Sequence, residues 1–212
     1  MLEAAKPQVE ERFVKKVVIA SNNVHKVEEI RTALDFEGWE FFTLSELDIQ
    51  SDPDEDADTF EGNARIKALA AHEASGFAAL ADDSGIVVDA LGGAPGVHSA
   101  RYAGEHGCDD DNNAKLLAEL ADVPEDERTG RFVCTLVFID EDGAEVVAEG
   151  TIEGSIGYEL AGDEGFGYDP LFLPEQFDGK RTLAQVSQAE KNEISHRGNA
   201  LRQLKAKIAA QL

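Results

Sequence analysis

Residues 132–140, FVCTLVFID, are apolar at almost every position and do not alternate with polar residues. A strand of this kind is buried on both faces, which places it in the middle of a sheet. The turn EDG joins it to residues 144–156, AEVVAEGTIEGSI, which have the pattern of a second long strand. The chain therefore builds its sheet around a long hairpin.

The segments on either side of this hairpin follow other patterns. Strands are expected at 17–20, 39–44 and 77–82, with a further short strand at 86–91, and helices at 25–36, 59–75 and 111–121. Ser187 and Glu190 match a capping box, and a last helix carries Leu201, Leu204 and Ile208 toward the core. Alternating strands and helices, then a hairpin, then helices predict an α/β fold with a mixed sheet.

The composition limits the partners of the chain. Among 212 residues, 19 are basic and 43 acidic, which gives a net charge of −24. Such a surface repels nucleic acid and anionic membranes, so neither is expected as a partner. The start of the chain is not a secretory signal, and Cys108 and Cys134 fit reduced thiols. We expect a cytoplasmic protein adapted to salt, with a polar, mobile extension at 1–14 and a single domain at 15–212.

The segment SNNVHK links the first strand to the first helix. Free N–H groups at a helix start attract phosphate, Ser21 and Asn23 add donors, and Lys26 adds charge. A lysine in the first turn opposes the helix dipole, so stability alone does not explain it. An ordinary capped polar turn is the competing interpretation.

The next candidates are a helix face and a pair of acids. Asn63 and Lys67 are four residues apart and share a helix face, although a lysine lying along an apolar surface has the same spacing. Asp82 and Asp83 are expected at the end of a strand, with side chains on opposite faces. One carboxylate can then face a Mg²⁺ ion or a water, with a second ligand from the acidic loop DPDEDAD. A simple DDSG turn is the alternative.

Two later segments add aromatic and donor side chains. The loop GDEGFGYDP carries aromatics that can stack on a base, or else anchor the loop in the core. The segment EKNEISHRG brings Lys191, His196 and Arg197 together, and His and Arg donors can bond carbonyl oxygens on a base edge. Taken together, the segments indicate a nucleoside triphosphate site.

Five blocks carry a resemblance to a known family. SNNVHK, FEGNARIKA, ADDSGIVVDALGGAPGVHSARYAG, GFGYDPLF and EKNEISHRGNAL, in this order, resemble the inosine triphosphate pyrophosphatase family. The resemblance covers the chain from about Lys16 to its end. It implies a long, curved mixed sheet flanked by helices, with two lobes, a central cleft and kinship to Maf proteins. It also implies a homodimer that requires Mg²⁺ and hydrolyses dITP, ITP or XTP to the monophosphate and pyrophosphate, which removes these nucleotides from the pool.

The resemblance also implies residue roles. Asp83 would accept the proton of the attacking water and bind the metal with Glu55, and Lys67 would act beside it. The expected substrate contacts are Ser21, Asn22, Asn23, Val24, His25, Lys26, Asn63, Ser84, Phe166, Gly167, Tyr168, Asp169, Lys191, Ser195, His196 and Arg197. Ser21, Asn23 and Lys26 would hold the triphosphate, and Lys67 and Lys191 would add positive charge to its site. Phe166 to Asp169 would frame the base, and His196 and Arg197 would favour a 6-keto purine over adenine.

Three positions depart from the family pattern. Asn22 stands where glycine is usual, and asparagine tolerates the left-handed region that such a turn needs. His25 replaces a small residue, and Gly62 stands where many members carry glutamate, so Gly62 receives no catalytic role. Two other functions stay open. One is a Maf-type pyrophosphatase acting on other bases, and the other is a nucleotide-binding sensor without turnover.

Overall fold

The computed structural model describes residues 14–34, 36–104 and 108–210, so the expected extension at 1–14 lies outside this part except for Val14. Six strands form one sheet in the order β2-β1-β3-β4-β5-β6. Their bounds are β1 Lys15–Ile19, β2 Trp39–Thr43, β3 Ala78–Val88, β4 Thr129–Ile139, β5 Glu145–Ile156 and β6 Phe172–Pro174. β1 runs parallel to β2 and β3, whereas β3 to β6 pair antiparallel. The expected mixed sheet with a central β4 is confirmed.

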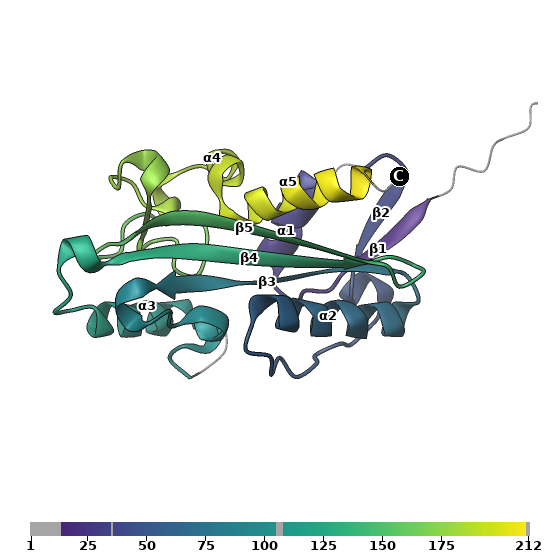
Figure 1. The fold of residues 1–212 in the computed structure, drawn as a ribbon, viewed down its shortest axis with the longest axis horizontal. Coiled ribbons are helices and arrows are strands. Elements are labelled where there is room, and N and C mark those ends of the chain that lie inside the picture. The colour runs from purple at the N-terminus through teal and green to yellow at the C-terminus, as the bar shows by residue number, and fades with distance from the viewer. Residues whose placement is uncertain (1–13, 35, 105–107, 211–212) are drawn as a thin grey trace, which may run out of the picture.

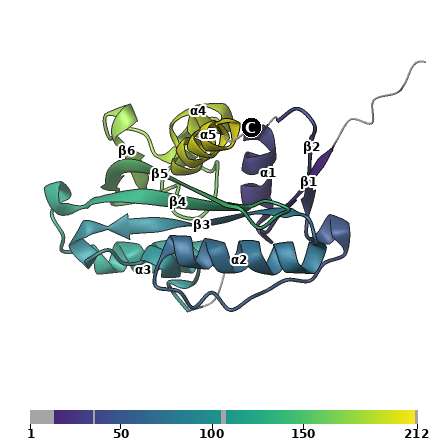
Figure 2. The ribbon, with the colours of Figure 1, turned by 45° about the vertical axis from the view of Figure 1, so that its right-hand side comes forward.

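Helices cover both faces of this sheet (Figure 1). α2 (Phe60–Ser75) and α3 (Asp109–Glu119) lie on one face, and α1 (Val24–Ala33), α4 (Gln188–Ile194) and α5 (His196–Ala209) lie on the other, as Figure 2 also shows. α2 begins after the N-cap Thr59 and ends at Gly76, whose left-handed backbone closes the helix. Along the described ranges, every helix falls short of the length and apolarity that crossing a bilayer requires.

The apolar core divides along the length of the sheet. At one end, β1 packs against α1 and α5 through residues such as Val17, Ile30 and Leu204, while the alanines of α2 fill the opposite face. At the other end, a separate cluster joins β3, β4 and β5 to α3 and the loop before β6, through residues such as Ile86 and Phe132. Asp82 to Ser84 lie on β3 between these two ends of the core.

The structure corrects several predicted boundaries. β3 is one continuous strand, so Asp82 and Asp83 lie in its middle and not at a strand end, and residues 86–88 belong to it. The whole strand is paired with β4, from Ala79 to Val88, and this long partner overrides the local DDSG turn signal. The C-terminal helical region is broken at Ser195, which ends α4 and caps α5.

The capping box of Ser187 and Glu190 is present as predicted. β6 was not predicted.

α5 lies against β5 at Gly150, where no side chain fits. A Cβ atom on Gly150 would stand 2.2 Å from the carbonyl oxygen of His196 and 2.3 Å from the nitrogen of Ala200. The missing side chain lets the two backbones approach closely. Because His196 and Arg197 begin α5, this contact sets where both side chains project.

We expect Gly150→Ala to lower the free energy of unfolding by about 1–3 kcal/mol, because the new methyl group pushes α5 away from β5. Urea or thermal unfolding measures the change. Gly157→Ala is the matched control, since its Cβ would stand at least 3.4 Å from its neighbours, and its stability should stay within about 0.5 kcal/mol of wild type. Equal loss in the two variants would contradict this account of the contact.

Candidate active site

The paired aspartates of β3 point to opposite faces of the sheet, as the alternation of a strand requires. Asp82 faces α1 and α5, where its Oδ1 lies 2.7 Å from Lys26 Nζ and its Oδ2 accepts a hydrogen bond from Arg197 Nε at 2.8 Å. Asp83 faces α2, where Lys67 Nζ donates to its Oδ1 at 2.8 Å. One dipeptide therefore supplies carboxylates to two different environments.

A first cavity of about 380 Å³ opens on the side of Asp83. It lies between the β1–α1 turn, the acidic loop before α2, the middle of β3 and the short helix η3 (Gly96–Arg101). Its polar lining comprises Ser21, Asn22, Asn23, Lys26, Ser51, Asp52, Glu55, Lys67, Asp82, Asp83, Ser84 and Arg101. The first cavity thus gathers most of the residues predicted to hold phosphates and metal.

The β1–α1 turn is organised by its own polar side chains. Ser21 Oγ accepts a hydrogen bond from the nitrogen of Asn23, and Asn23 Oδ1 accepts from the nitrogens of His25 and Lys26. Asn23 is therefore the N-cap of α1. The expectation for Asn22 was wrong, because the non-glycine residues with positive φ in the described chain are Asp48 and Asp178.

Lys67 joins two carboxylates at the floor of the first cavity. Its ammonium donates to Asp83 at 2.8 Å and to Glu55 at 2.9 Å. Burial opposes the charge on Lys67, but Asp83 and Glu55 outweigh it and raise the lysine pKa. Burial raises the pKa of Asp83, and Lys67 and Lys26 offset this only in part. Asp83 thus takes up a proton more readily than an ordinary aspartate does.

Glu55 and Asp83 are the residues of this cavity best suited to a divalent metal. Both carboxylates contact the same ammonium, so they lie close together, and no cluster of three or more His, Cys, Asp or Glu side chains suited to a metal occurs in the described ranges. Mg²⁺ usually takes one or two carboxylates and completes its shell with water and phosphate oxygens. Two oxygen donors in an open cavity fit that requirement.

A second, smaller cavity of about 100 Å³ adjoins the first. Asn23, Lys26, Ser84 and Ala100 line both cavities. The other lining residues of the second cavity are Gly85, Ser99, Asp109, Phe132, Phe166, Gly167, Tyr168, Asp169, Lys191, His196 and Arg197. The second cavity therefore combines aromatic rings with cationic donors.

The loop that carries Phe166 is held at several points. Asp169 Oδ2 accepts from the nitrogen of Phe166 at 2.9 Å, and the hydroxyl of Tyr168 donates to the carbonyl of Ser99 at 2.8 Å. Asn113 donates to the carbonyl of Gly167 at 2.8 Å. Tyr168 and Asp169 are therefore anchors of the loop, and Phe166 is the aromatic residue that it presents to the cavity.

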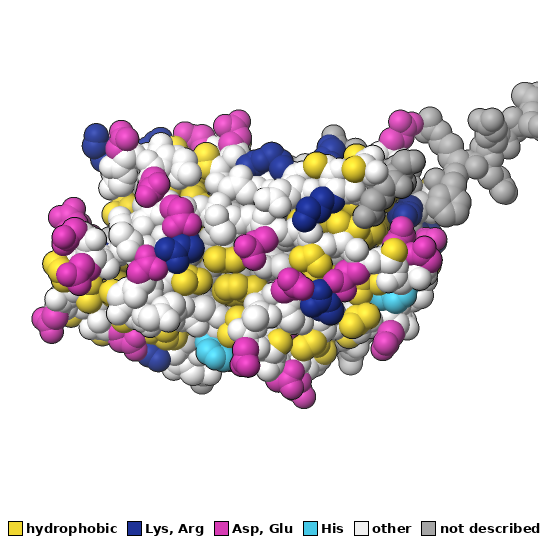
Figure 3. Space-filling model, viewed as in Figure 1, with side chains coloured by type: hydrophobic (Ala, Val, Ile, Leu, Met, Phe, Trp, Pro, Cys, Tyr) yellow, Lys and Arg dark blue, Asp and Glu magenta, His cyan; other side chains and the backbone are white. Residues whose placement is uncertain are grey.

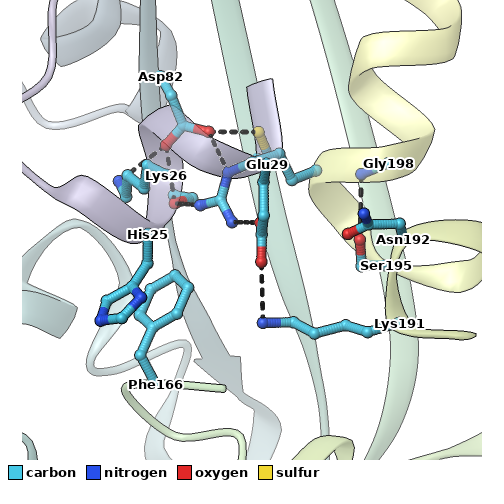
Figure 4. Close-up of polar contacts among 12 residues, drawn as sticks. His25, Lys26, Glu29, Asp82, Phe166, Lys191, Asn192, Ser195 and Gly198 are labelled. Carbon is cyan, nitrogen blue, oxygen red and sulfur yellow. Dashed lines mark hydrogen bonds and ion pairs between the residues drawn. The ribbon is translucent and has the colours of Figure 1, made fainter. Parts of the chain in front are cut away.

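Residues of alternating charge form a chain of ion pairs beside both cavities, and Figure 4 shows its members Lys26, Asp82, Glu29 and Lys191. In order, it comprises Lys26, Asp82, Arg197, Glu29, Lys191 and Asp169. Arg197 bonds Asp82 and Glu29, and its Nη2 donates to Ser84 Oγ at 3.0 Å. The carboxylates and cations are equal in number, so these buried charges neutralise one another.

This network sets the protonation of its members. Burial alone would raise the pKa of Asp82, but Arg197 and Lys26 hold that pKa well below its usual range. Arg197 and Lys191 likewise outweigh burial and lower the pKa of Glu29. Burial and the neighbouring Arg197 hold the pKa of His196 far below its ordinary value, so its imidazole is neutral. The Nδ1 atom of His196 is buried and has no hydrogen-bond partner in the described structure.

Lys191 lies in the second cavity, next to the loop that carries Phe166. Its ammonium is 2.8 Å from Asp169 Oδ2 and 3.1 Å from Glu29 Oε1, and it lines the second cavity but not the first. The same ammonium lies 4.7 Å from the centre of the Phe166 ring. Lys191 therefore shares a cavity with Lys26 but not with Lys67, and its contact with the triphosphate stays a prediction.

Four predicted contact residues line neither cavity. Val24 is exposed, and Asn63 is buried beneath Asp83, with its Oδ1 accepting from the nitrogen of Ala57. Ser195 caps α5 by accepting from the nitrogen of Gly198. His25 stacks on Phe166, with ring centres 5.3 Å apart, and supports that ring.

Sequence reasoning also missed residues that the fold brings to the site. Glu29 lies next to Ile30 on the buried side of α1, and its position three residues after Lys26 was the available signal. Arg101 stands in the most specific block of the resemblance but received no role. Asp82 was predicted to point to the face of the sheet opposite Asp83, but its ion pair with Arg197 was not predicted, because the two residues are distant in the sequence.

Comparison with known proteins identifies the lineage of the chain. Residues 17–207 match the profile of the Ham1 family. This chain belongs to the Ham1 family. The dITP/XTP pyrophosphatase of Clostridium perfringens is 48% identical over 198 residues, covering 91% of this chain and 96% of that protein. The dITP/XTP pyrophosphatase of Haemophilus influenzae is 48% identical over 196 residues, covering 91% and 98%.

Solved Ham1 structures share the fold. The Staphylococcus aureus Ham1 protein superposes with a TM-score of 0.83 at 40% identity, covering 93% of this chain and 100% of its own. A nucleoside-triphosphatase/dITP/XTP pyrophosphatase from Mycobacterium abscessus gives a TM-score of 0.74 at 43% identity, covering 89% and 98%. These matches confirm both the family resemblance and the mixed-sheet fold expected from the sequence.

We expect Glu29→Gln to destabilise this Ham1-family chain by about 3 kcal/mol at pH 7, because it leaves Arg197 and Lys191 short of a buried carboxylate. The pKa of Glu29 is lower in the folded protein than its ordinary value of 4.5. The unfolded chain therefore binds more protons below about pH 5, and the stability that Glu29 supplies is lost as the pH falls toward its folded pKa.

Denaturant unfolding of both proteins at pH 7 and at acid pH measures this difference. The difference in the free energy of unfolding between wild type and Glu29→Gln should become smaller in acid. Wild type loses the contribution of the Glu29 charge there, whereas glutamine does not titrate. Glu28→Gln, at the exposed neighbouring position, is the control and should match wild type at both pH values. A gap that stays constant with pH would contradict the role given to the Glu29 charge.

Proposed function

We propose that this protein hydrolyses non-standard purine nucleoside triphosphates, namely dITP, ITP and XTP, to the monophosphate and pyrophosphate. One observation carries the proposal: a cavity with lysines and the Asp83–Lys67–Glu55 group adjoins a cavity with Phe166 and cationic donors, and shared residues link the two. A triphosphate fits the first and a base the second. The dITP/XTP pyrophosphatase names of its relatives support the same activity.

The phosphate end is built from the β1–α1 turn and α2. Ser21 and Asn22 supply polar groups, while Asn23 and Lys26 line both cavities and lie where the α-phosphate would join the nucleoside. Lys67 keeps its proton because two carboxylates raise its pKa. A protonated lysine beside the reacting phosphate stabilises the charge that develops during phosphoryl transfer.

Asp83 is the proposed proton acceptor. Water attacks a phosphorus of the α–β anhydride, its proton passes to Asp83, and the anhydride bond breaks to release pyrophosphate. The raised pKa of Asp83 brings it closer to the range in which a carboxylate is an effective base. Glu55 and Asp83 would also hold Mg²⁺, which neutralises phosphate charge and favours ionisation of a bound water.

The base end favours a purine with a carbonyl group at C6. Lys191 and Arg197 only donate hydrogen bonds, so they suit a carbonyl oxygen and not the amino group of adenine. His196 is neutral, and its free Nδ1 offers a further polar contact to a base. Phe166 provides the stacking surface, supported from behind by His25. We further propose a homodimer, which the family resemblance alone supports, and a cytoplasmic location, which the free thiols of Cys108 and Cys134 favour.

We expect Asp83→Asn to reduce turnover of ITP by about 10²–10⁴-fold, because the amide cannot accept the proton of the water. Pyrophosphate release measures turnover, and calorimetry with ITP should show that binding is retained. Asp122→Asn, at an exposed position away from both cavities, is the control and should turn over like wild type. Near-normal activity of Asp83→Asn would overturn the assignment.

A nucleotide panel separates this function from its rivals. With Mg²⁺ present, dITP, ITP and XTP should be hydrolysed with a kcat/KM about 10²-fold or more above that of ATP, dTTP and UTP, because adenine lacks the 6-carbonyl that the donors bond and the single ring of thymine or uracil covers less of Phe166. Without Mg²⁺, release of pyrophosphate should fall sharply. Preference for dTTP or UTP would favour the Maf-type alternative, and binding without release would favour a sensor.

A further inference from the structure

The lysines of the first cavity are already paired with carboxylates, so little of their positive charge is available to a ligand. Lys26 is paired with Asp82 at 2.7 Å, and Lys67 is paired with both Asp83 and Glu55. Asp52 adds another acid to the same lining. Two lysines and four carboxylates leave this wall with an excess of negative charge, although a polyphosphate must lie against it.

Arg101 is the exception. It lines the first cavity, and no ion pair joins it to a carboxylate within the described part of the chain. Among the residues that the structure describes, its guanidinium makes one hydrogen bond, from Nη2 to the carbonyl of Glu55 at 3.3 Å. A guanidinium carries five N–H donors, so most of its donors remain available to a ligand in the cavity.

The backbone around Arg101 is fixed from several sides. Ser99 Oγ accepts from the nitrogen of Ile86 at 3.0 Å, and the carbonyl of Ser99 accepts from Tyr168. On the other side, Lys115 Nζ donates to the carbonyl of Tyr102 at 2.8 Å. These contacts hold η3 against β3 and α3. The side chain of Arg101 therefore projects from a rigid segment of backbone. A side chain that is positioned before the ligand arrives needs such support.

We propose that Arg101 binds the pyrophosphate portion of the substrate, an inference that rests on the proposed function. Arg101 lines only the first cavity, whereas the residues next to the nucleoside line both. It therefore faces the β- and γ-phosphates rather than the α-phosphate. The planar guanidinium forms paired hydrogen bonds with phosphate oxygens, and its charge offsets an anion that the paired lysines leave uncompensated.

The test compares Arg101→Gln and Arg101→Lys with wild type, using inorganic pyrophosphate and inosine monophosphate as separate calorimetric probes at a fixed Mg²⁺ concentration. Arg101→Gln should weaken pyrophosphate binding by about 10-fold or more, since hydrogen bonds to charged groups are lost, and should leave inosine monophosphate binding unchanged. Arg101→Lys should bind pyrophosphate with an affinity between those of wild type and Arg101→Gln. Lysine keeps the positive charge but lacks the planar guanidinium that forms paired hydrogen bonds. The KM for ITP should rise more than kcat falls.

Arg131→Gln is the matched control, because Arg131 is paired with Asp89 and Glu153 and lines neither cavity. Unchanged pyrophosphate binding in Arg101→Gln, while wild type hydrolyses ITP, would overturn the role of Arg101 and leave the proposed function intact. Equal weakening of both probes would also overturn it, since general damage to the site has that effect. A wild type that neither hydrolyses ITP nor binds pyrophosphate would overturn both proposals.

Discussion

The ion pairs between Asp82, Arg197 and Glu29 hold together the three elements on which the site depends. Asp82 comes from β3, Glu29 from α1 and Arg197 from the first turn of α5. Each side chain is almost fully buried, so an unpaired charge at any of these positions would be strongly destabilising. Because these three charged side chains are buried and must stay paired, they fix the positions of α1 and α5 relative to the central sheet.

The pleat of β3 explains how neighbouring aspartates take different roles. Asp82 meets two cations in a closed interior, and its pKa is held low. Asp83 meets Lys67 at the edge of a cavity, where burial keeps its pKa raised. Two carboxylates whose environments push their pKa values apart can divide structural and proton-transfer tasks, which is the division that the proposed function assigns to Asp82 and Asp83. The strand geometry creates the two environments without any further element.

The sequence predicted the elements and most of the site, but not the pairing of charges. Patterns of apolar residues located β4, β5 and α2, and the spacing of two polar residues located the capping box, because these features depend on local chemistry. The end of β3 was predicted too early because the turn propensity of DDSG is local, whereas the β4 partner that keeps this segment extended lies about fifty residues away. The ion pairs of Lys191 and Glu29 were not predicted for the same reason, since they join residues far apart in the chain.

The excess of acids on this protein need not prevent binding of an anion. Figure 3 shows acidic side chains spread over the visible face, among fewer basic ones, and the whole chain carries a net charge of −24. Exposed charges are screened beyond about 8 Å at physiological ionic strength, so the local arrangement decides. The carboxylates on Lys67 keep its ammonium protonated and positioned while no phosphate is bound. Under the proposed function, a substrate carrying its own metal ion would contact those carboxylates and that ammonium, so that the charges of the cavity would exchange partners and would not be left exposed.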